Sequence, residues 1–239
     1  MIRTAVLSDI HGNLPALEAV IADATAQGCD AFFNLGDSLS GPLWPAETAD
    51  RLISLDWPTI AGNHERQLFG TRLGASDAFA AARLSGRHRR WVESLPATLA
   101  INDAWLCHGS ARSDIEHLLF SVDTVGFRAA TDAEIPERLD GAATLTLCGH
   151  SHVAAERRLR DGRRIANPGS VGLPAYTDDR LYPYAVSNGD PWARYAILDD
   201  GRLTFHAVDY DHRAAARRAR DGGFDQWASW LETGKIPNT

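Results

Sequence analysis

The sequence has few cysteines and no long apolar segment, and both absences narrow its function. Its three cysteines, Cys29, Cys107 and Cys148, are odd in number and form no C-x-x-C pair. This pattern argues against a disulfide framework and predicts buried free thiols in a reducing compartment. The apolar run at the N-terminus is too short for a signal peptide and ends at Asp9. Because no candidate membrane span is visible either, we expect a soluble, cytoplasmic protein.

A strong net charge is also absent. The 239 residues carry a formal net charge of −7, with both signs scattered along the chain. This argues against nucleic acid or a membrane as the main partner, but it allows a small phosphate ester, because bound cations reverse the local field. The arginine-rich stretches 87–90 and 213–220 are therefore expected to be solvated helix faces.

Internal repeats, low-complexity tracts and interdomain linkers are missing as well. The chain is 44% hydrophobic and 23% charged, an ordinary globular composition. We therefore predict that residues 1–239 form a single domain. Trp227, Trp230 and Leu231 are expected in its core, although an exposed aromatic patch there would support a homodimer.

Short apolar runs alternate with amphipathic stretches, which predicts an α/β architecture. Strands are expected over 2–8, 31–35, 58–61, 97–101, 104–107, 144–148, 153–159, 163–167, 193–198 and 203–208. Helices are expected over 13–27, 45–55, most of 65–95, 211–221 and 225–233. Because the chain begins with βαβ crossovers and ends with hairpins, the sheets should be mixed. Residues 176–191 are expected to form a long surface loop.

Five polar clusters each follow an apolar strand. They are Asp9-x-His11, Gly36-Asp37, Gly62-Asn63-His64-Glu65, His108-Gly109 and Gly149-His150-x-His152. Strand ends are where α/β proteins collect functional side chains. Asp, His and Asn are ligands for borderline to hard divalent metals. The two side chains of Asp9-x-His11 are two residues apart, as are those of His150-x-His152. On an extended backbone, this spacing would point both side chains of a pair the same way.

In this order, the five clusters resemble the signature of the calcineurin-like metallophosphoesterases, in particular the small bacterial and archaeal phosphodiesterase-type members. The likeness continues through Asn167-Pro168-Gly169-Ser170 and 193–198 to Tyr210-Asp211, and so covers nearly the whole chain. The resemblance implies a four-layer αββα sandwich of two mixed sheets flanked by helices. It also implies two divalent metal ions, drawn from Mn, Fe, Zn, Co or Ni with Mn favoured, and a metal-bridging hydroxide as the nucleophile.

Carried over by residue, the resemblance implies a role for each cluster. One metal would be held by Asp9, His11 and His152, and the other by Asn63, His108 and His150, with Asp37 bridging them. Asn63 and His64 would contact the substrate, and His64 would be the general acid. Arg112 is a further candidate to bind the substrate phosphate.

The expected activity is hydrolysis of a phosphodiester or phosphomonoester of a small molecule or nucleotide, with the diester preferred. A protein serine/threonine phosphatase is disfavoured, because Gly36-Asp37 continues as Ser38-Leu39 and lacks the Asp-Arg pair of that branch. A non-catalytic scaffold of the same fold is disfavoured, because His64 and every metal position are intact. The segment 176–191 could be a lid, with Tyr176, Tyr182 or Tyr184 stacking on a base or sugar, or a plain surface excursion.

Overall fold

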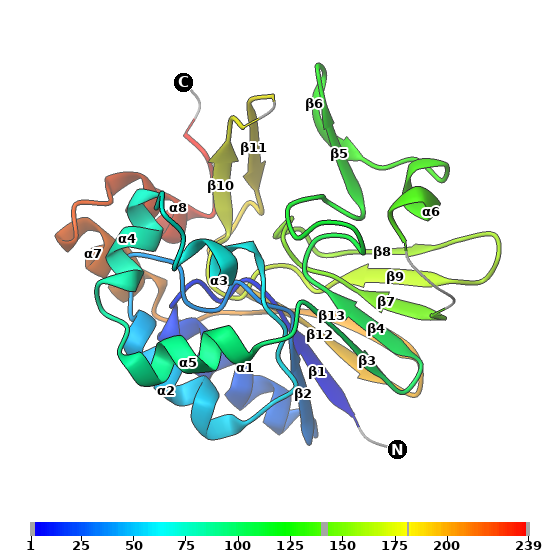
Figure 1. The fold of residues 1–239 in the computed structure, drawn as a ribbon, viewed down its shortest axis with the longest axis horizontal. Helices are drawn as coiled ribbons and strands as arrows, with labels where there is room; N and C mark the ends of the chain where they lie inside the picture. The colour runs from blue at the N-terminus through cyan, green and yellow to red at the C-terminus, as the bar shows by residue number, and fades with distance from the viewer. Residues whose placement is uncertain (1–2, 140–142, 181, 238–239) are drawn as a thin grey trace.

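The computed structural model describes residues 3–139, 143–180 and 182–237, so Ile2 of the first predicted strand lies outside the described residues. Two mixed β-sheets face each other, and most of the helices gather against one of them (Figure 1). The helices are α1 (Leu14–Ala26), α2 (Pro45–Leu55), α3 (Asn63–Gln67), α4 (Ala75–Ala81), α5 (Gly86–Ser94), α6 (Glu134–Arg138), α7 (His212–Asp221) and α8 (Asp225–Thr233).

The first sheet has the strand order β13-β12-β1-β2. Its strands are β1 (Thr4–Leu7), β2 (Ala31–Asn34), β12 (Ala193–Asp199) and β13 (Arg202–Val208). The crossover through α1 makes β1 and β2 parallel, whereas β12 runs antiparallel to both β1 and β13. Helix α1 begins where the sequence predicts, because the side chain of Asn13 accepts a hydrogen bond from the backbone N–H of Ala16.

The second sheet has the strand order β3-β4-β7-β9-β8. Its strands are β3 (Thr98–Ile101), β4 (Ala104–Cys107), β7 (Leu145–Leu147), β8 (Ala155–Arg158) and β9 (Arg164–Asn167). Strands β4, β7 and β9 are parallel, and the two edge strands are antiparallel to their neighbours. Both sheets are therefore mixed, as predicted.

Apolar side chains fill three layers around the sheets. Val6, Leu106, Leu147 and Ala196 belong to the cluster shared by the two sheets. A larger cluster joins the first sheet to α1, α2, α7 and α8. The outer face of the second sheet carries a smaller cluster that includes Ile135 of α6. The outermost helical layer is thus thick on one side and reduced to a single five-residue helix on the other.

Several elements differ from the sequence-based expectation. Residues 58–61 form no strand; only Thr59 bridges to Asn34. The segment 65–95 is mostly helical, as predicted, and divides into three short helices. Two unpredicted hairpins also occur, β5 (Phe120–Asp123) with β6 (Gly126–Ala129), and β10 (Ala175–Asp178) with β11 (Tyr184–Ser187). The interpretation of 176–191 as a loop is therefore wrong: most of this segment is the second hairpin.

Among the described residues, no helix is long and apolar enough to cross a membrane. The cysteines agree with the sequence-based expectation, since all three are free and buried.

Candidate metal centre

The predicted polar clusters meet where parallel strands end. Strands β1 and β2 lead to Asp9 and Asp37, and strands β4 and β7 of the facing sheet lead to His108 and His150. The loops are tied together by backbone hydrogen bonds, for example from the N–H of Asp9 to the carbonyl of Gly36 at 3.0 Å. The two sheets therefore deliver their polar ends to one place.

The backbone at these loops is left-handed rather than extended. Asp9, His11, Asp37, His150 and His152 all have φ between 53° and 66°. They make up five of the eight non-glycine residues with positive φ in the described parts of the chain. The expectation that Asp9 and His11 share a direction through extended geometry is therefore wrong. Non-glycine residues rarely adopt this conformation, and its concentration here marks backbone strain at one site.

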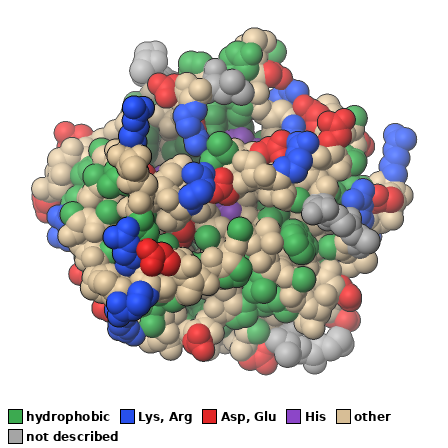
Figure 2. Space-filling view, viewed as in Figure 1, with side chains coloured by type: hydrophobic (Ala, Val, Ile, Leu, Met, Phe, Trp, Pro, Cys, Tyr) green, Lys and Arg blue, Asp and Glu red, His purple; other side chains and the backbone are tan. Residues whose placement is uncertain are grey.

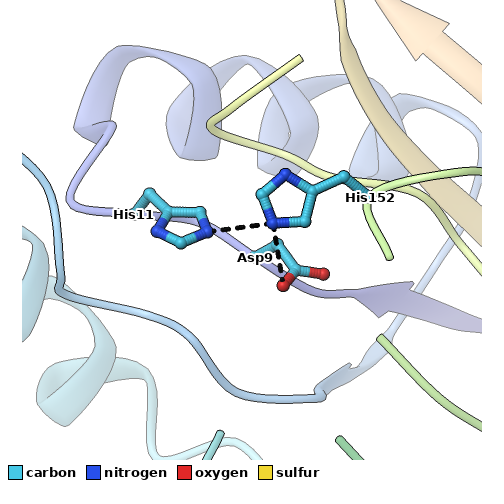
Figure 3. A group of neighbouring side chains, drawn as sticks. All are labelled: Asp9, His11 and His152. Atoms are coloured by element: carbon cyan, nitrogen blue, oxygen red, sulfur yellow. Dashed lines mark hydrogen bonds and ion pairs between the residues drawn. The ribbon is translucent and has the colours of Figure 1, made fainter. Parts of the chain in front are cut away.

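The first group of converging side chains is Asp9, His11 and His152, all buried (Figure 3). The Nδ1 atoms of His11 and His152 each lie 2.8 Å from a carbonyl oxygen, those of Ser40 and Leu173. A carbonyl only accepts, so each Nδ1 carries a proton and each Nε2 is the ring nitrogen that faces the site. The two Nε2 atoms are 3.2 Å apart, and that of His152 is 3.4 Å from Asp9 Oδ1. Two imidazole nitrogens that face each other beside a carboxylate are an arrangement that a shared cation stabilises.

Burial and the neighbouring His152 ring lower the pKa of His11 to about 4, so the His11 ring is neutral at pH 7. Burial raises the pKa of Asp9, but the nearby histidines outweigh it and lower that pKa below its usual value. The first group therefore offers one carboxylate and a neutral imidazole, the states in which these side chains bind metals.

The second group is Asp37, His108 and His150, again buried. His108 donates from Nδ1 to the carbonyl of Leu35 at 2.7 Å, and its Nε2 lies 3.1 Å from Asp37 Oδ2. His150 has the opposite arrangement: its Nε2 lies 3.2 Å from the carbonyl of Ile115, which leaves Nδ1 as the ring nitrogen that can bind a metal. In each group, the three ligand atoms lie within 4.8 Å of one another.

Electrostatics in the second group call for a positive charge. Burial lowers the pKa of His108, but the negative charges of Asp37 and Asp9 outweigh it and raise this pKa to about 10. The histidine charges in turn hold the pKa of Asp37 well below its usual value despite burial. Either a proton or a metal ion must therefore stand between His108 and Asp37.

Asp9 Oδ1 and Asn63 Oδ1 are buried at the site and have no hydrogen-bond partner among the described residues. A buried polar atom without a partner is costly and normally bonds to a group at the site. Carboxylate and amide oxygens with imidazole nitrogens form a donor set for divalent first-row metals. The residues present therefore fit metal ions, and Asn63 lies at the same cavity as both groups.

Glu65 fixes the loop that carries Asp37. Its carboxylate accepts hydrogen bonds from the backbone N–H groups of Asp37, Ser38 and Gly62, at 2.7–2.8 Å. Gly62 must be glycine here, because a Cβ would lie 2.3 Å from Asp37 Oδ1. Asp37 Oδ1 itself accepts from the backbone N–H of His64 at 2.8 Å.

His64 is held by a carboxylate that the sequence did not reveal. Its Nδ1 lies 2.8 Å from Asp77 Oδ1 on α4, and Ser40 Oγ donates to the same oxygen at 2.7 Å. Burial lowers the pKa of His64, but Asp37 and the bond to Asp77 raise it to about 9. Asp77 belongs to no motif; only the fold shows that it orients His64.

A cavity of about 470 Å³ opens above the two groups. Histidine side chains are visible within a hollow on the face shown in Figure 2. Arg72, Arg180 and Trp227 line this cavity, although no motif contains them. Arg112 does not line it; its guanidinium is exposed and pairs with Glu116 at 2.6 Å.

The β10–β11 hairpin forms one wall of the cavity. Tyr176 lines the cavity, with its ring 4.6 Å from that of His152. Tyr184 lies behind Tyr176, and Tyr182 is exposed and does not line the cavity. Of the three tyrosines considered from the sequence, Tyr176 is thus nearest the candidate ligands.

The sequence is similar to those of known proteins. A sequence model described as a calcineurin-like phosphoesterase superfamily domain matches residues 2–188. An uncharacterized protein of Methanocaldococcus jannaschii, MJ0912, is 24% identical, and the alignment covers 93% of this chain and 94% of that protein.

Two crystal structures are similar over their full length. A metallophosphoesterase from Sphaerobacter thermophilus is 27% identical with a TM-score of 0.76, covering 98% of this chain and 100% of that one. The hypothetical protein PH1004 from Pyrococcus horikoshii OT3 is 17% identical with a TM-score of 0.75, covering 99% and 100%. The second likeness concerns the fold alone.

Proposed function

The chain belongs to the calcineurin-like phosphoesterase superfamily, and from this premise we propose that it is a single-domain phosphodiesterase using two divalent metal ions. The observation that carries the proposal is the pair of buried ligand groups beside one cavity. In the first group, two ring nitrogens already face each other at 3.2 Å, each on a ring held by a backbone carbonyl.

We assign the ligands as the two groups suggest. Asp37 belongs to the second group and lies beside the first, so it would be shared between the ions. The ligands of one ion would be Asp9, His11, Asp37 and His152, and those of the other Asp37, Asn63, His108 and His150. When bound, two such ions supply an activated water and stabilise negative charge at phosphorus. Manganese is the favoured metal, although this ligand set accepts several.

His64 would supply the proton. It lies at the cavity with Nδ1 fixed by Asp77, which directs Nε2 to other partners. Without bound metal, the charge of Asp37 and the bond to Asp77 raise the pKa of His64 to about 9 despite burial, and the bond to Asp77 favours the protonated ring. As water attacks phosphorus and the ester P–O bond breaks, the departing oxygen takes the proton from Nε2, so an alcohol leaves instead of an alkoxide.

The substrate would be a small molecule or nucleotide. No Asp-Arg pair follows Gly36-Asp37, which disfavours a protein phosphatase, and the intact His64 disfavours a scaffold. Phosphomonoesters are the alternative substrate class within the same chemistry.

The test is hydrolysis of bis(p-nitrophenyl) phosphate against p-nitrophenyl phosphate, with manganese and after chelation. Asp37→Asn and His64→Ala should be compared with Asp56→Asn and His212→Ala. Asp56 shares the left-handed backbone of Asp37 but ends α2, and neither control residue lines the cavity. We expect metal-dependent turnover, with the diester faster, that Asp37→Asn lowers about 10³-fold. His64→Ala should lower it less, since p-nitrophenol leaves with little need of a proton, and the two control variants should not change it. Folded, metal-loaded protein without turnover of either ester would contradict the proposal.

A further inference from the structure

A second cleft of about 420 Å³ adjoins the candidate metal centre. It is lined by the β5–β6 hairpin, the segment around His117, and the turn end of the β10–β11 hairpin. Asp178 and Arg180 line both this cleft and the cavity above the metal ligands. The two hairpins stand side by side, with β6 in contact with β11 (Figure 1).

Only one aromatic ring separates the second cleft from the metal ligands. His117 lines the cleft, and its ring stacks on that of His150 with centroids 4.6 Å apart. The carbonyl that orients His150 belongs to Ile115, which also lines the cleft. A group bound there would thus lie next to the ion held by His150.

The charges in the second cleft are already matched. Its lining contains three arginines and four carboxylates, a net charge of −1. Arg128 pairs with Asp123 and Glu134 at 2.8 and 2.9 Å. Arg138 donates to the carbonyls of His117 and Phe120 and to Ser121 Oγ. Among the described residues that line the cleft, no cation is left unpaired for a second phosphate, so the cleft suits an uncharged group.

The cleft also offers an aromatic wall and an unused polar atom. Phe120 and Tyr184 line it, and Phe127 stacks against both, at 4.7 Å and 16° and at 5.4 Å and 9°. His117 is only 7% exposed; its Nε2 lies 3.0 Å from the Tyr184 hydroxyl. Its buried Nδ1 has no partner among the described residues. Rigid rings with one free hydrogen-bonding atom are typical of sites for planar polar rings.

His64 indicates which part of a diester would lie there. Its ring packs near His11, at 5.4 Å, in the first ligand group. The second cleft lies behind His150, in the other group. A leaving alcohol that takes its proton from His64 would thus depart on the side away from the second cleft.

We propose that the second cleft binds the organic group that the phosphate retains, and that this group is an uncharged planar ring of the nucleoside type. This proposal rests on the proposed phosphodiesterase function and specifies its substrate. The Asp178–Arg180 pair, 2.7 Å from Oδ2 to Nε, would lie at the border crossed by the substrate.

The test uses two diesters that release the same leaving group, thymidine 5′-(p-nitrophenyl phosphate) and methyl p-nitrophenyl phosphate. Val122→Trp would fill the cleft, because Val122 lines it on β5. Val125→Trp is the matched control, since Val125 is 88% exposed on the same hairpin and does not line the cleft. We expect Val122→Trp to lower kcat/KM for the thymidine diester at least about tenfold more than for the methyl diester, as lost stacking would. Val125→Trp should leave the ratio unchanged.

A second variant guards against misfolding. Phe120→Ala removes part of the wall without adding volume, and it should lower the same ratio, whereas Phe205→Ala on β13 should not. A ratio unaffected by both Val122→Trp and Phe120→Ala would overturn the proposal.

Binding without turnover separates this proposal from the proposed function. Thymidine should perturb the NMR signals of the chelated wild-type protein and of Val125→Trp, but not those of Val122→Trp. If no diester is hydrolysed with any metal, the proposed function fails, and thymidine binding alone then decides on the cleft. Absence of thymidine binding to the wild-type protein would overturn the proposal even in an active enzyme.

Discussion

The floor of the cavity is made by strand ends, whereas its walls are made by short hairpins and helices. We define the floor as the seven candidate ligands, Asp9, His11, Asp37, Asn63, His108, His150 and His152. The walls are the β5–β6 and β10–β11 hairpins together with Arg72, His117 and Trp227. The floor is buried and its ring orientations are fixed by backbone carbonyls. The walls are half-exposed and are held by stacked rings and ion pairs.

This difference suggests a division of labour. A rigid, preorganised floor suits chemistry that is common to many esters, because metal ligands must be held within a fraction of an ångström. Walls built from short hairpins tolerate change and select the substrate. Floor variants should therefore lower the rate for every ester, and wall variants should alter the ranking of substrates.

The largest effect is expected at Asp37. Asp37→Asn removes the charge shared by both groups, and loss of several kcal/mol of transition-state stabilisation corresponds to about 10³-fold in kcat. Steady-state rates with bis(p-nitrophenyl) phosphate and its monoester measure this effect. Both should fall alike, while Asp56→Asn changes neither. A drop confined to one ester would break the division between floor and walls.

A variant of Asp77 tests whether the rate also depends on a residue outside the seven candidate ligands, one that only orients His64. Asp77→Asn keeps the shape but weakens the hold on His64 Nδ1, and we expect a loss of about 10- to 100-fold for esters of alcohols with high pKa. Esters of p-nitrophenol need little protonation and should lose less. Asp114→Asn is the matched control, since Asp114 pairs only with exposed Arg66. Equal losses for good and poor leaving groups would show that Asp77 acts on stability instead.

The meeting of the floor residues could be predicted from the sequence, because the local sequence pattern shows the strands that they follow. Four of the five clusters follow an apolar strand, as Asp9 follows β1 and His150 follows β7; the fifth, which holds Asn63, follows only the bridge at Thr59. The periodicity also located α1, α2, α7 and α8 to within one or two residues. Parallel strands then bring such ends together in any α/β arrangement.

The walls could not be predicted from the sequence, because the contacts that form them join segments far apart in the chain. Strands β10 and β11 are only four residues long, and β10 shows no regular alternation of buried and exposed residues. His117 belongs to no motif, and only the packing of distant segments stacks it on His150. Asp77 likewise meets His64 only through the turn between α3 and α4. Contacts of this kind depend on tertiary packing, which a sequence pattern does not report.

Metal binding at the floor should depend on pH, and the walls should add nothing to this dependence. Metal binding must displace the proton of His108, whose pKa is about 10 without metal. Since the proton competes with the metal below that pH, manganese affinity should rise about tenfold per pH unit between pH 6 and 8 for each proton released. His11, with a pKa of about 4, is already neutral there and adds no pH dependence.

Calorimetry in buffers of different ionisation enthalpy counts the protons released. His108→Asn should abolish this release, whereas His117→Gln in the wall should preserve it, because burial lowers the pKa of His117 to about 4. An affinity independent of pH would contradict the assignment of His108 as a ligand.

The smallest effects are expected at two arginines: Arg180, which lines the cavity, and Arg112, which lies outside it. Arg180 lines the cavity but is shared with Asp178, so Arg180→Ala should raise KM for methyl p-nitrophenyl phosphate only about fivefold, the effect of a partly exposed ion pair. Arg112 is the candidate suggested by the sequence, but it faces Glu116 outside the cavity, so Arg112→Ala should leave kcat and KM within about twofold, as is usual for an exposed pair. If Arg112→Ala instead raised KM more than Arg180→Ala, the segment following His108 would have to reach the substrate, and the boundary between floor and walls would need to be redrawn to include it.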